Sequence, residues 1–304
     1  MSTTSQQFEL AQQAVLDHFD TDATSRHVRI ADPPLDVHVL EVGQGRPVVM
    51  LHGGGGMAVQ MEPLLGGLGE HFRVLAPDRP GCGLTDAFDY AGVDFRSHGV
   101  RFLESLLDAL ELDHASIVAG SIAGLWALAF AHDRPERTQR VVLVGSPAGL
   151  TSDAPIPLRL AGTPVIGHLL SVTVMRPSEA NTRRQFEEFV VDTDGIPEEI
   201  ITATHAATSL PGAHDSFTSM VRQVVTLRGF DPDALVVDYL PDIEAPVLFV
   251  WGSGDGVYPP SVGREAVARL PNARLEVIEG AGHFVWLDAP RRTSQLAIDF
   301  LRAD

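Results

Sequence analysis

The chain has 304 residues, of which 44% are hydrophobic and 20% charged, a composition typical of a globular domain with room for an inserted subdomain. Its 40 acidic residues outnumber 22 basic ones, all arginine, and the formal charge is -18. A surface this negative repels phosphate backbones and anionic lipid headgroups, so we expect no nucleic-acid or membrane partner.

Targeting signals are missing from the sequence. No apolar run approaches the ~18 residues that cross a bilayer, and residues 1–10 lack a signal peptide, so we expect a cytoplasmic protein. The single cysteine, Cys82, excludes an internal disulfide, and no zinc site of the usual ligand spacing is expected. Composition leaves the oligomeric state open between monomer and homodimer.

Residues 1–24 are predicted to contain an amphipathic helix, because apolar residues recur there at helical spacing: Phe8, Ala11, Val15 and Phe19. Eight apolar segments then predict strands, at 28–30, 37–42, 47–51, 72–76, 115–118, 140–144, 246–251 and 273–278. The later segments are almost continuously apolar, as in strands covered on both faces, and alternate with predicted helices at 95–110, 122–132, 261–270 and 291–301. We therefore predict an α/β fold with a doubly wound, mostly parallel sheet of eight strands.

Residues 149–240 interrupt the alternation of strands and helices. Prolines divide this stretch into short helical patterns, with apolar residues such as Val165, Leu169 and Phe186, and no clear strand is visible. We interpret it as a helical cap inserted between two strands, on the ligand-binding edge of the sheet. The core would then comprise residues 25–148 and 241–304.

Ser121 follows a buried strand and precedes a helix, within the run Ala119-Gly-Ser-Ile-Ala-Gly124. Small residues two before and two after the serine permit a sharp strand-to-helix turn, where a larger Cβ would collide with neighbouring backbone. Such a turn raises the serine hydroxyl above the sheet and directs the helix N-terminus at it. We therefore predict Ser121 as a nucleophile.

A glycine run, Gly53–Gly56, follows the apolar segment 47–51 and His52. Glycines let backbone N–H groups approach a ligand closely, so we predict that Gly54 and Ile122 form an oxyanion hole. A phosphate-binding loop is the rival interpretation, but no Lys-Ser/Thr pair follows these glycines.

Asp255 and His283 each lie just beyond a predicted strand, after 246–251 and 273–278 respectively. Together with Ser121 they give the chain order Ser, Asp, His of one known triad, in which the acid orients the base. The rival acid is Asp153, the first carboxylate after segment 140–144. We favour Asp255 because its Gly-Ser-Gly-Asp turn directly follows a buried strand.

With these segments and with residues 76–86, which contain a Gly-x-Gly-x-Thr run, the chain resembles α/β hydrolases over about residues 27–302. The cap resembles those of carboxylesterases and of the carbon–carbon hydrolases of aromatic-ring degradation. The latter usually carry Asn before the serine and Trp after the histidine, where this chain has Gly120 and Phe284. Epoxide hydrolases and haloalkane dehalogenases use an Asp nucleophile, so Ser121 places this chain outside both groups.

The triad predicts a serine hydrolase that cleaves carboxylic esters of small apolar substrates through an acyl-enzyme, with no metal or organic cofactor. Two alternatives keep the same residues: a carbon–carbon hydrolase of ring-cleavage products, and a cofactor-free perhydrolase or haloperoxidase-like enzyme. A non-catalytic ligand-binding relative is disfavoured, because the whole triad and the glycine-rich loop are present.

Overall fold

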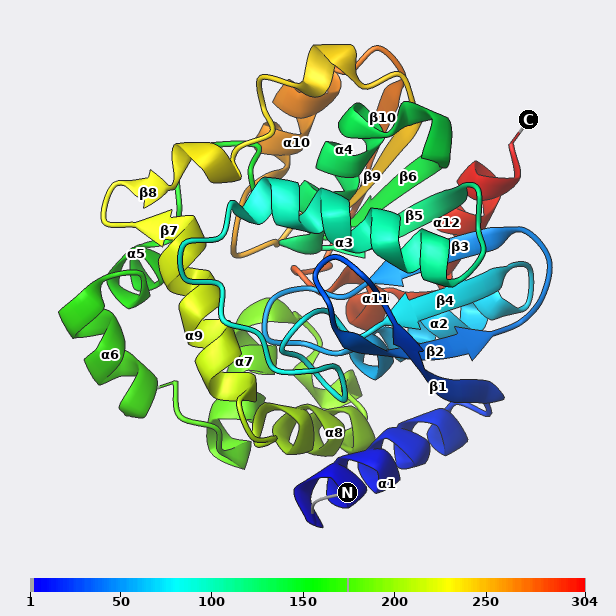
Figure 1. The fold of residues 1–304 in the computed structure, drawn as a ribbon. Coiled ribbons are helices and arrows are strands. Elements are labelled where there is room, and N and C mark those ends of the chain that lie inside the picture. Colours follow the sequence, from blue (N-terminus) through cyan, green and yellow to red (C-terminus); the bar gives the residue numbers. More distant parts are fainter. Residues whose placement is uncertain (1–2, 174, 304) are drawn as a thin grey trace.

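A computed structural model describes residues 3–173 and 175–303 (Figure 1). Its main sheet has eight strands in the order β1-β2-β4-β3-β5-β6-β9-β10. The strands β1 and β2 are antiparallel, as are β2 and β4, and every other neighbouring pair is parallel. The prediction of a mostly parallel, eight-stranded sheet is therefore confirmed. The strand bounds are β1 Ala23–Arg29, β2 Asp36–Val42, β3 Pro47–Leu51, β4 Arg73–Pro77, β5 Ala115–Gly120, β6 Thr138–Val144, β9 Val247–Gly252 and β10 Ala273–Ile278.

Helices cover both faces of this sheet, and each face packs into its own apolar cluster. One cluster joins the sheet to α3, α4 and α10, and the other joins it to α1, α2, α11 and α12. β5 and β9 are buried along their whole length, which explains their continuous apolar sequences. The helix bounds are α1 Thr3–His18, α2 Glu62–Gly69, α3 Phe95–Ala109, α4 Ala123–Asp133, α10 Pro260–Val267, α11 Val285–Asp288 and α12 Pro290–Arg302.

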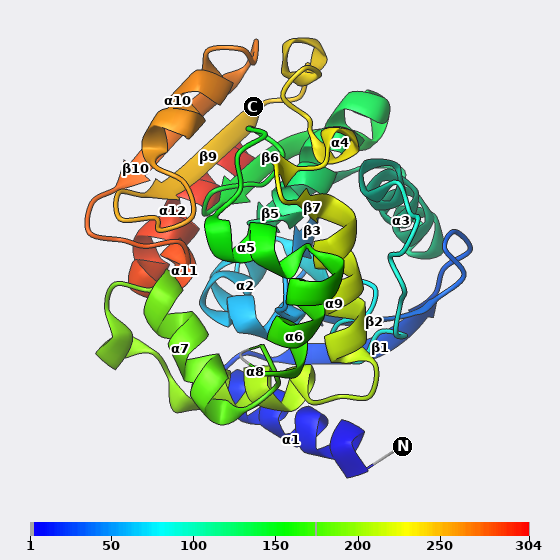
Figure 2. The same cartoon turned by 90° about the vertical axis from the view of Figure 1, so that its left-hand side faces the viewer.

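Among the described residues, five α-helices lie between β6 and β9, within the predicted insertion. Figures 1 and 2 show them gathered on one side of the sheet, where α1 runs along α8. Their bounds are α5 Ile156–Ala161, α6 Pro164–Val172, α7 Glu179–Phe189, α8 Glu198–Thr208 and α9 Ala213–Val224.

One detail of the insertion differs from the sequence prediction. A short antiparallel pair, β7 (Val225–Thr226) and β8 (Gly229–Phe230), follows α9, and strands of two residues are too short to leave an alternating pattern. Val165 and Leu169, both on α6, are 81% and 60% exposed. In the part of the chain that is described, no helix is long and apolar enough to span a bilayer.

Candidate active site

Ser121 lies in the turn between β5 and α4. Its φ of 52° is in the left-handed region, one of three such non-glycine residues in the described chain. L-residues adopt this conformation at a cost, and it persists where surrounding structure enforces it. Here Ala123 is fully packed and a Cβ on Gly124 would lie 2.5 Å from the side chain of Pro147, so only small residues fit around the turn. The clash at Gly124 is with a side chain, one position beyond the alanines on which the sequence prediction rested.

The structure brings the three predicted catalytic side chains into one relay. The Oγ of Ser121 lies 2.9 Å from Nε2 of His283, and Nδ1 of His283 lies 2.9 Å from Oδ2 of Asp255. Both distances are those of hydrogen bonds. The side chains of His283 and Asp255 are 2% and 0% exposed, so this pair is shielded from bulk water, whereas Ser121 is half-buried.

The Asp255 carboxylate is buried yet held ionised. Burial alone would raise its pKa, but the hydrogen bond and charge of His283, together with backbone N–H donors, outweigh burial and hold the pKa of Asp255 below its ordinary value. Those donors belong to Val257, at 2.8 Å from Oδ1, and to Ser146, at 2.9 Å from Oδ2. An ionised acid can accept from Nδ1–H of His283 and leave Nε2 free to take the proton of Ser121.

Sequence reasoning missed Ser146 as a site residue. Its hydroxyl lies 3.1 Å from Oδ1 of Asp255 and 3.1 Å from Nδ1 of His283, so it contacts the other two members of the relay. Ser146 follows the end of β6, which is adjacent to β5, and the carboxyl ends of adjacent parallel strands meet at one edge of a sheet. The position of Ser146 just after a predicted strand could be read from the sequence. A serine in a Gly-Ser-Pro turn, however, matches no catalytic motif.

The predicted oxyanion loop lies against Ser121. A Cβ on Gly53 would be 3.1 Å from Cβ of Ser121, and one on Gly54 would be 3.5 Å from the side chain of Ile122. Within residues 3–173 and 175–303, the backbone N–H groups of Gly54 and Ile122 donate no hydrogen bond to other protein atoms. Two unpaired N–H groups, one on the residue after Ser121 and one on the loop that packs against it, are what an oxyanion site requires.

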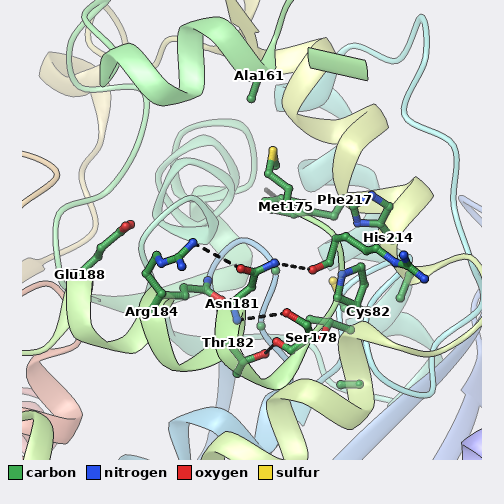
Figure 3. Close-up of a pocket in the computed structure, with 18 of the residues that line it drawn as sticks. Cys82, Ala161, Met175, Ser178, Asn181, Thr182, Arg184, Glu188, His214 and Phe217 are labelled. Carbon is green, nitrogen blue, oxygen red and sulfur yellow. Dashed lines mark hydrogen bonds between the residues drawn. The ribbon is translucent and has the colours of Figure 1, made fainter. Parts of the chain in front are cut away.

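A cavity of about 360 Å³ adjoins the relay. Its lining includes Gly55 and Gly56 of the glycine loop, and Phe189, whose ring centroid lies 5.2 Å from that of His283. Helices α5, α7, α8 and α9 supply most of the remaining wall (Figure 3). Since Ser121 and His283 are not themselves in the lining, the cavity is an outer chamber next to the nucleophile.

Two further side chains considered in the sequence analysis, those of Asp153 and Cys82, make no contact that suggests a catalytic role. Asp153 is 71% exposed at its side chain and pairs with Arg159, outside the relay. Cys82 lines the cavity, and burial raises the pKa of its thiol to about 11, which keeps it protonated.

Comparison with known families and proteins gives a consistent result. Residues 48–296 match the family model described as "Alpha/beta hydrolase family". A 2-hydroxy-6-oxo-6-phenylhexa-2,4-dienoate hydrolase of Burkholderia cepacia is 31% identical, over 91% of this chain and 96% of its own. A 2-hydroxy-6-oxononadienedioate/2-hydroxy-6-oxononatrienedioate hydrolase of Cupriavidus pinatubonensis is 30% identical, over 91% and 95%.

Solved structures share the fold over nearly the whole chain. The carboxylesterase CesB of Bacillus subtilis superposes with a TM-score of 0.78 at 19% identity, covering 99% of both chains. A meta-cleavage product hydrolase of Pseudomonas fluorescens IP01 gives a TM-score of 0.74 at 26% identity, covering 93% of this chain and 98% of its own. These similarities confirm the fold class expected from the sequence.

Proposed function

Because the chain belongs to the alpha/beta hydrolase family, we propose that it is a serine hydrolase that cleaves a carbon–carbon bond in 2-hydroxy-6-oxo-dienoates, the ring-cleavage products of aromatic compounds. The Ser121–His283–Asp255 relay, beside two unpaired N–H groups, supports the serine chemistry. The relatives support the substrate class, since two dienoate hydrolases align with the chain almost end to end. They favour this reaction over the ester hydrolysis that the sequence placed first.

In the proposed first half-reaction, the 2-hydroxydienoate first tautomerises to its 2,6-dioxo form, the 2-OH proton being lost and a proton added at carbon 5. Oγ of Ser121 then adds to the 6-oxo carbon while Nε2 of His283 takes its proton. The carbonyl oxygen becomes an oxyanion, which accepts hydrogen bonds from the N–H groups of Gly54 and Ile122. Collapse of this intermediate breaks the bond between carbons 5 and 6. The departing carbon's electron pair is delocalised toward the 2-oxo group of the keto tautomer, and His283 supplies the proton that completes the dienol.

The second half-reaction releases the acid from the enzyme. Water gives a proton to His283 and adds to the ester carbonyl on Ser121, and the same two N–H groups hold the oxyanion again. Collapse returns the proton to Oγ and frees a carboxylic acid. Asp255 stays ionised throughout and stabilises the imidazolium that forms in each half-reaction.

The cavity walls support an anionic substrate with an apolar tail. Two arginines, Arg176 and Arg184, line the chamber together with apolar groups such as Leu158, Met175 and Phe217. Figure 3 shows Arg184 on the α7 wall, opposite Met175 and Phe217. We propose that residues 149–240 act as the cap of this chamber, so that a dienoate carboxylate meets the arginines and its substituent meets the apolar wall.

Ester hydrolysis is the second candidate, and two residues favour it. Carbon–carbon hydrolases of this fold usually carry Asn before the nucleophile and Trp after the catalytic histidine, whereas this chain has Gly120 and Phe284. The relay serves either reaction, because only the leaving group differs.

Product analysis separates the two candidates. We expect wild-type enzyme to convert 2-hydroxy-6-oxo-6-phenylhexa-2,4-dienoate into benzoate and 2-hydroxypenta-2,4-dienoate, with loss of the dienoate chromophore. Its kcat/KM for this substrate should exceed those for p-nitrophenyl acetate, butyrate and octanoate. Turnover of the esters with no benzoate from the dienoate would establish the second candidate instead.

A further inference from the structure

Arg79, in the loop after β4, is 1% exposed. Within the described residues it forms no ion pair with a carboxylate, although an unpaired buried charge is costly. The neighbouring Asp78 binds His38 and the backbone N–H groups of Ala58 and Leu84 instead. The positive charge of Arg79 is therefore not balanced by a salt bridge, and its role must be sought in its other contacts.

The guanidinium of Arg79 is directed at the glycine loop. Its Nε donates to the carbonyl of His52 at 2.9 Å, and its Nη2 donates to the carbonyl of Gly53 at 2.7 Å. The guanidinium carbon also lies 5.2 Å from the ring centroid of Trp126. This cation–π interaction partly offsets the desolvation cost of the buried guanidinium. The arginine thus anchors the loop at two successive peptide groups.

The carbonyl of Gly53 and the N–H of Gly54 belong to one peptide group. A hydrogen bond from a cation to the carbonyl oxygen draws electron density toward that oxygen and leaves the N–H at the other end a stronger donor. That N–H is one of the two unpaired groups beside Ser121. Arg79 thereby acts on the oxyanion site through a single peptide, without touching substrate.

His52 completes the arrangement. The backbone N–H of Arg79 donates to Nε2 of His52 at 2.9 Å, which leaves the ring proton on Nδ1, 2.9 Å from the same carbonyl of Gly53. Burial, and then the charge of Arg79, lower the pKa of His52 to about 3, so the ring is neutral and this tautomer persists. The Gly53 carbonyl therefore has two donors holding it in place.

We propose that Arg79 is a positioning residue that orients and polarises the Gly53–Gly54 peptide for the oxyanion. The inference rests on the proposed function, since it concerns the tetrahedral intermediate on Ser121. Preorganised donors matter most when charge develops, so the effect belongs to the transition state and not to substrate binding.

The test compares Arg79→Met and Arg79→Lys with wild type in kcat, in KM, and in the inhibition constant of an alkyl trifluoromethyl ketone, which forms a hemiketal oxyanion on the serine. The substrate is p-nitrophenyl butyrate or the phenyl dienoate, whichever wild type turns over faster. Removing one direct oxyanion donor costs about 10²–10³-fold in kcat. We expect Arg79→Met to lose less, about 10- to 100-fold, with KM changed by under about threefold.

The ketone separates a polarising role from a structural one. Its inhibition constant should rise by the same factor as kcat/KM falls. Arg79→Lys keeps the charge but not the two-pronged geometry, and should lose roughly 3- to 10-fold in both quantities. Arg96→Met is the matched control, because Arg96 also stacks on a ring, that of Tyr239, but pairs with Asp133 outside the site. It should leave all three constants unchanged.

Two failures are distinguishable. If a fluorophosphonate labels wild type but not Ser121→Ala, while folded Arg79 variants keep wild-type kcat and ketone affinity, the role of Arg79 is overturned and the hydrolase proposal stands. If wild type is not labelled at all, both proposals fall. Should Arg79→Met not fold, the Lys variant decides, and wild-type constants in that variant would contradict the inference.

Discussion

Ser146 and Asp255 are joined at two points: the serine hydroxyl lies 3.1 Å from Oδ1 of the carboxylate, and the serine N–H donates to Oδ2 at 2.9 Å. Ser146→Ala removes the first contact and keeps the second. A hydrogen bond to a charged group contributes about 1.5–3 kcal/mol, so we expect kcat to fall roughly 10-fold or more. Ser97→Ala, which removes a serine–carboxylate contact to Asp94 at the start of α3, should leave kcat unchanged. Equal kcat in both variants would remove Ser146 from the site.

The identity of the acid is tested by two asparagine variants. Asp255→Asn places an amide beside Nδ1 of His283, which favours the wrong tautomer and should lower kcat by about 10⁴-fold without unfolding the protein. Asp153→Asn alters an exposed pair with Arg159 and should change kcat little. Steady-state kinetics measure kcat of the two variants, and thermal melts show whether each is folded. A larger loss of kcat in Asp153→Asn than in Asp255→Asn would assign the acid to Asp153.

Arg184 offers a test of substrate charge. Arg184→Met should raise KM for the phenyl dienoate, by roughly fivefold for a solvent-exposed ion pair, and leave KM for the uncharged p-nitrophenyl butyrate unchanged. The matched control is Arg183→Met, one residue away on α7, which pairs with Glu179 and Glu198 and does not line the cavity. A KM increase for both substrates would indicate altered packing of the cap rather than carboxylate recognition.

Glu62 predicts a pH-dependent stability. Its side chain is buried at the start of α2, where burial raises its pKa from 4.5 to about 7 despite a hydrogen bond from Thr21. Because the folded-state pKa is raised, the stabilising contribution is complete below pH 4.5 and is lost as pH rises through about 7. At 1.36 kcal/mol per pKa unit the full loss is about 3 kcal/mol.

Thermal melts between pH 5 and pH 8.5 measure this effect. Wild type should lose Tm across that range, and Glu62→Gln should lose markedly less. The exposed Glu70→Gln variant should follow wild type. Parallel curves for wild type and Glu62→Gln would show that the carboxyl of Glu62 does not titrate in the folded protein.

The sheet was predictable because strands such as β5 and β9 are buried on both faces, and continuous burial demands continuous apolar sequence. The predicted relay residues follow from the same logic, since Ser121, Asp255 and His283 each come just after a strand. Local sequence cannot show which side chains from distant loops meet. Ser146 contacts the side chains of Asp255 and His283, and Arg79 binds two backbone carbonyls, so the role proposed for each depends on contacts that the surrounding sequence does not reveal.

The insertion was harder to predict for a physical reason. Its helices are short, and an apolar residue on such a helix can face solvent, as Val165 does, without unfolding the core. Apolar residues therefore indicated that residues 149–240 are helical, but not the bounds of the helices or the direction in which they face.

The most direct test of the central claim is the turnover of 2-hydroxy-6-oxo-6-phenylhexa-2,4-dienoate by wild type and by Ser121→Ala, followed as loss of the dienoate chromophore and as benzoate formed. Wild type should release benzoate, and Ser121→Ala should fold normally and lose about 10⁴-fold or more in kcat, since the relay then has no nucleophile. Near-wild-type benzoate release by Ser121→Ala, with the variant's identity verified by intact mass, would contradict the account.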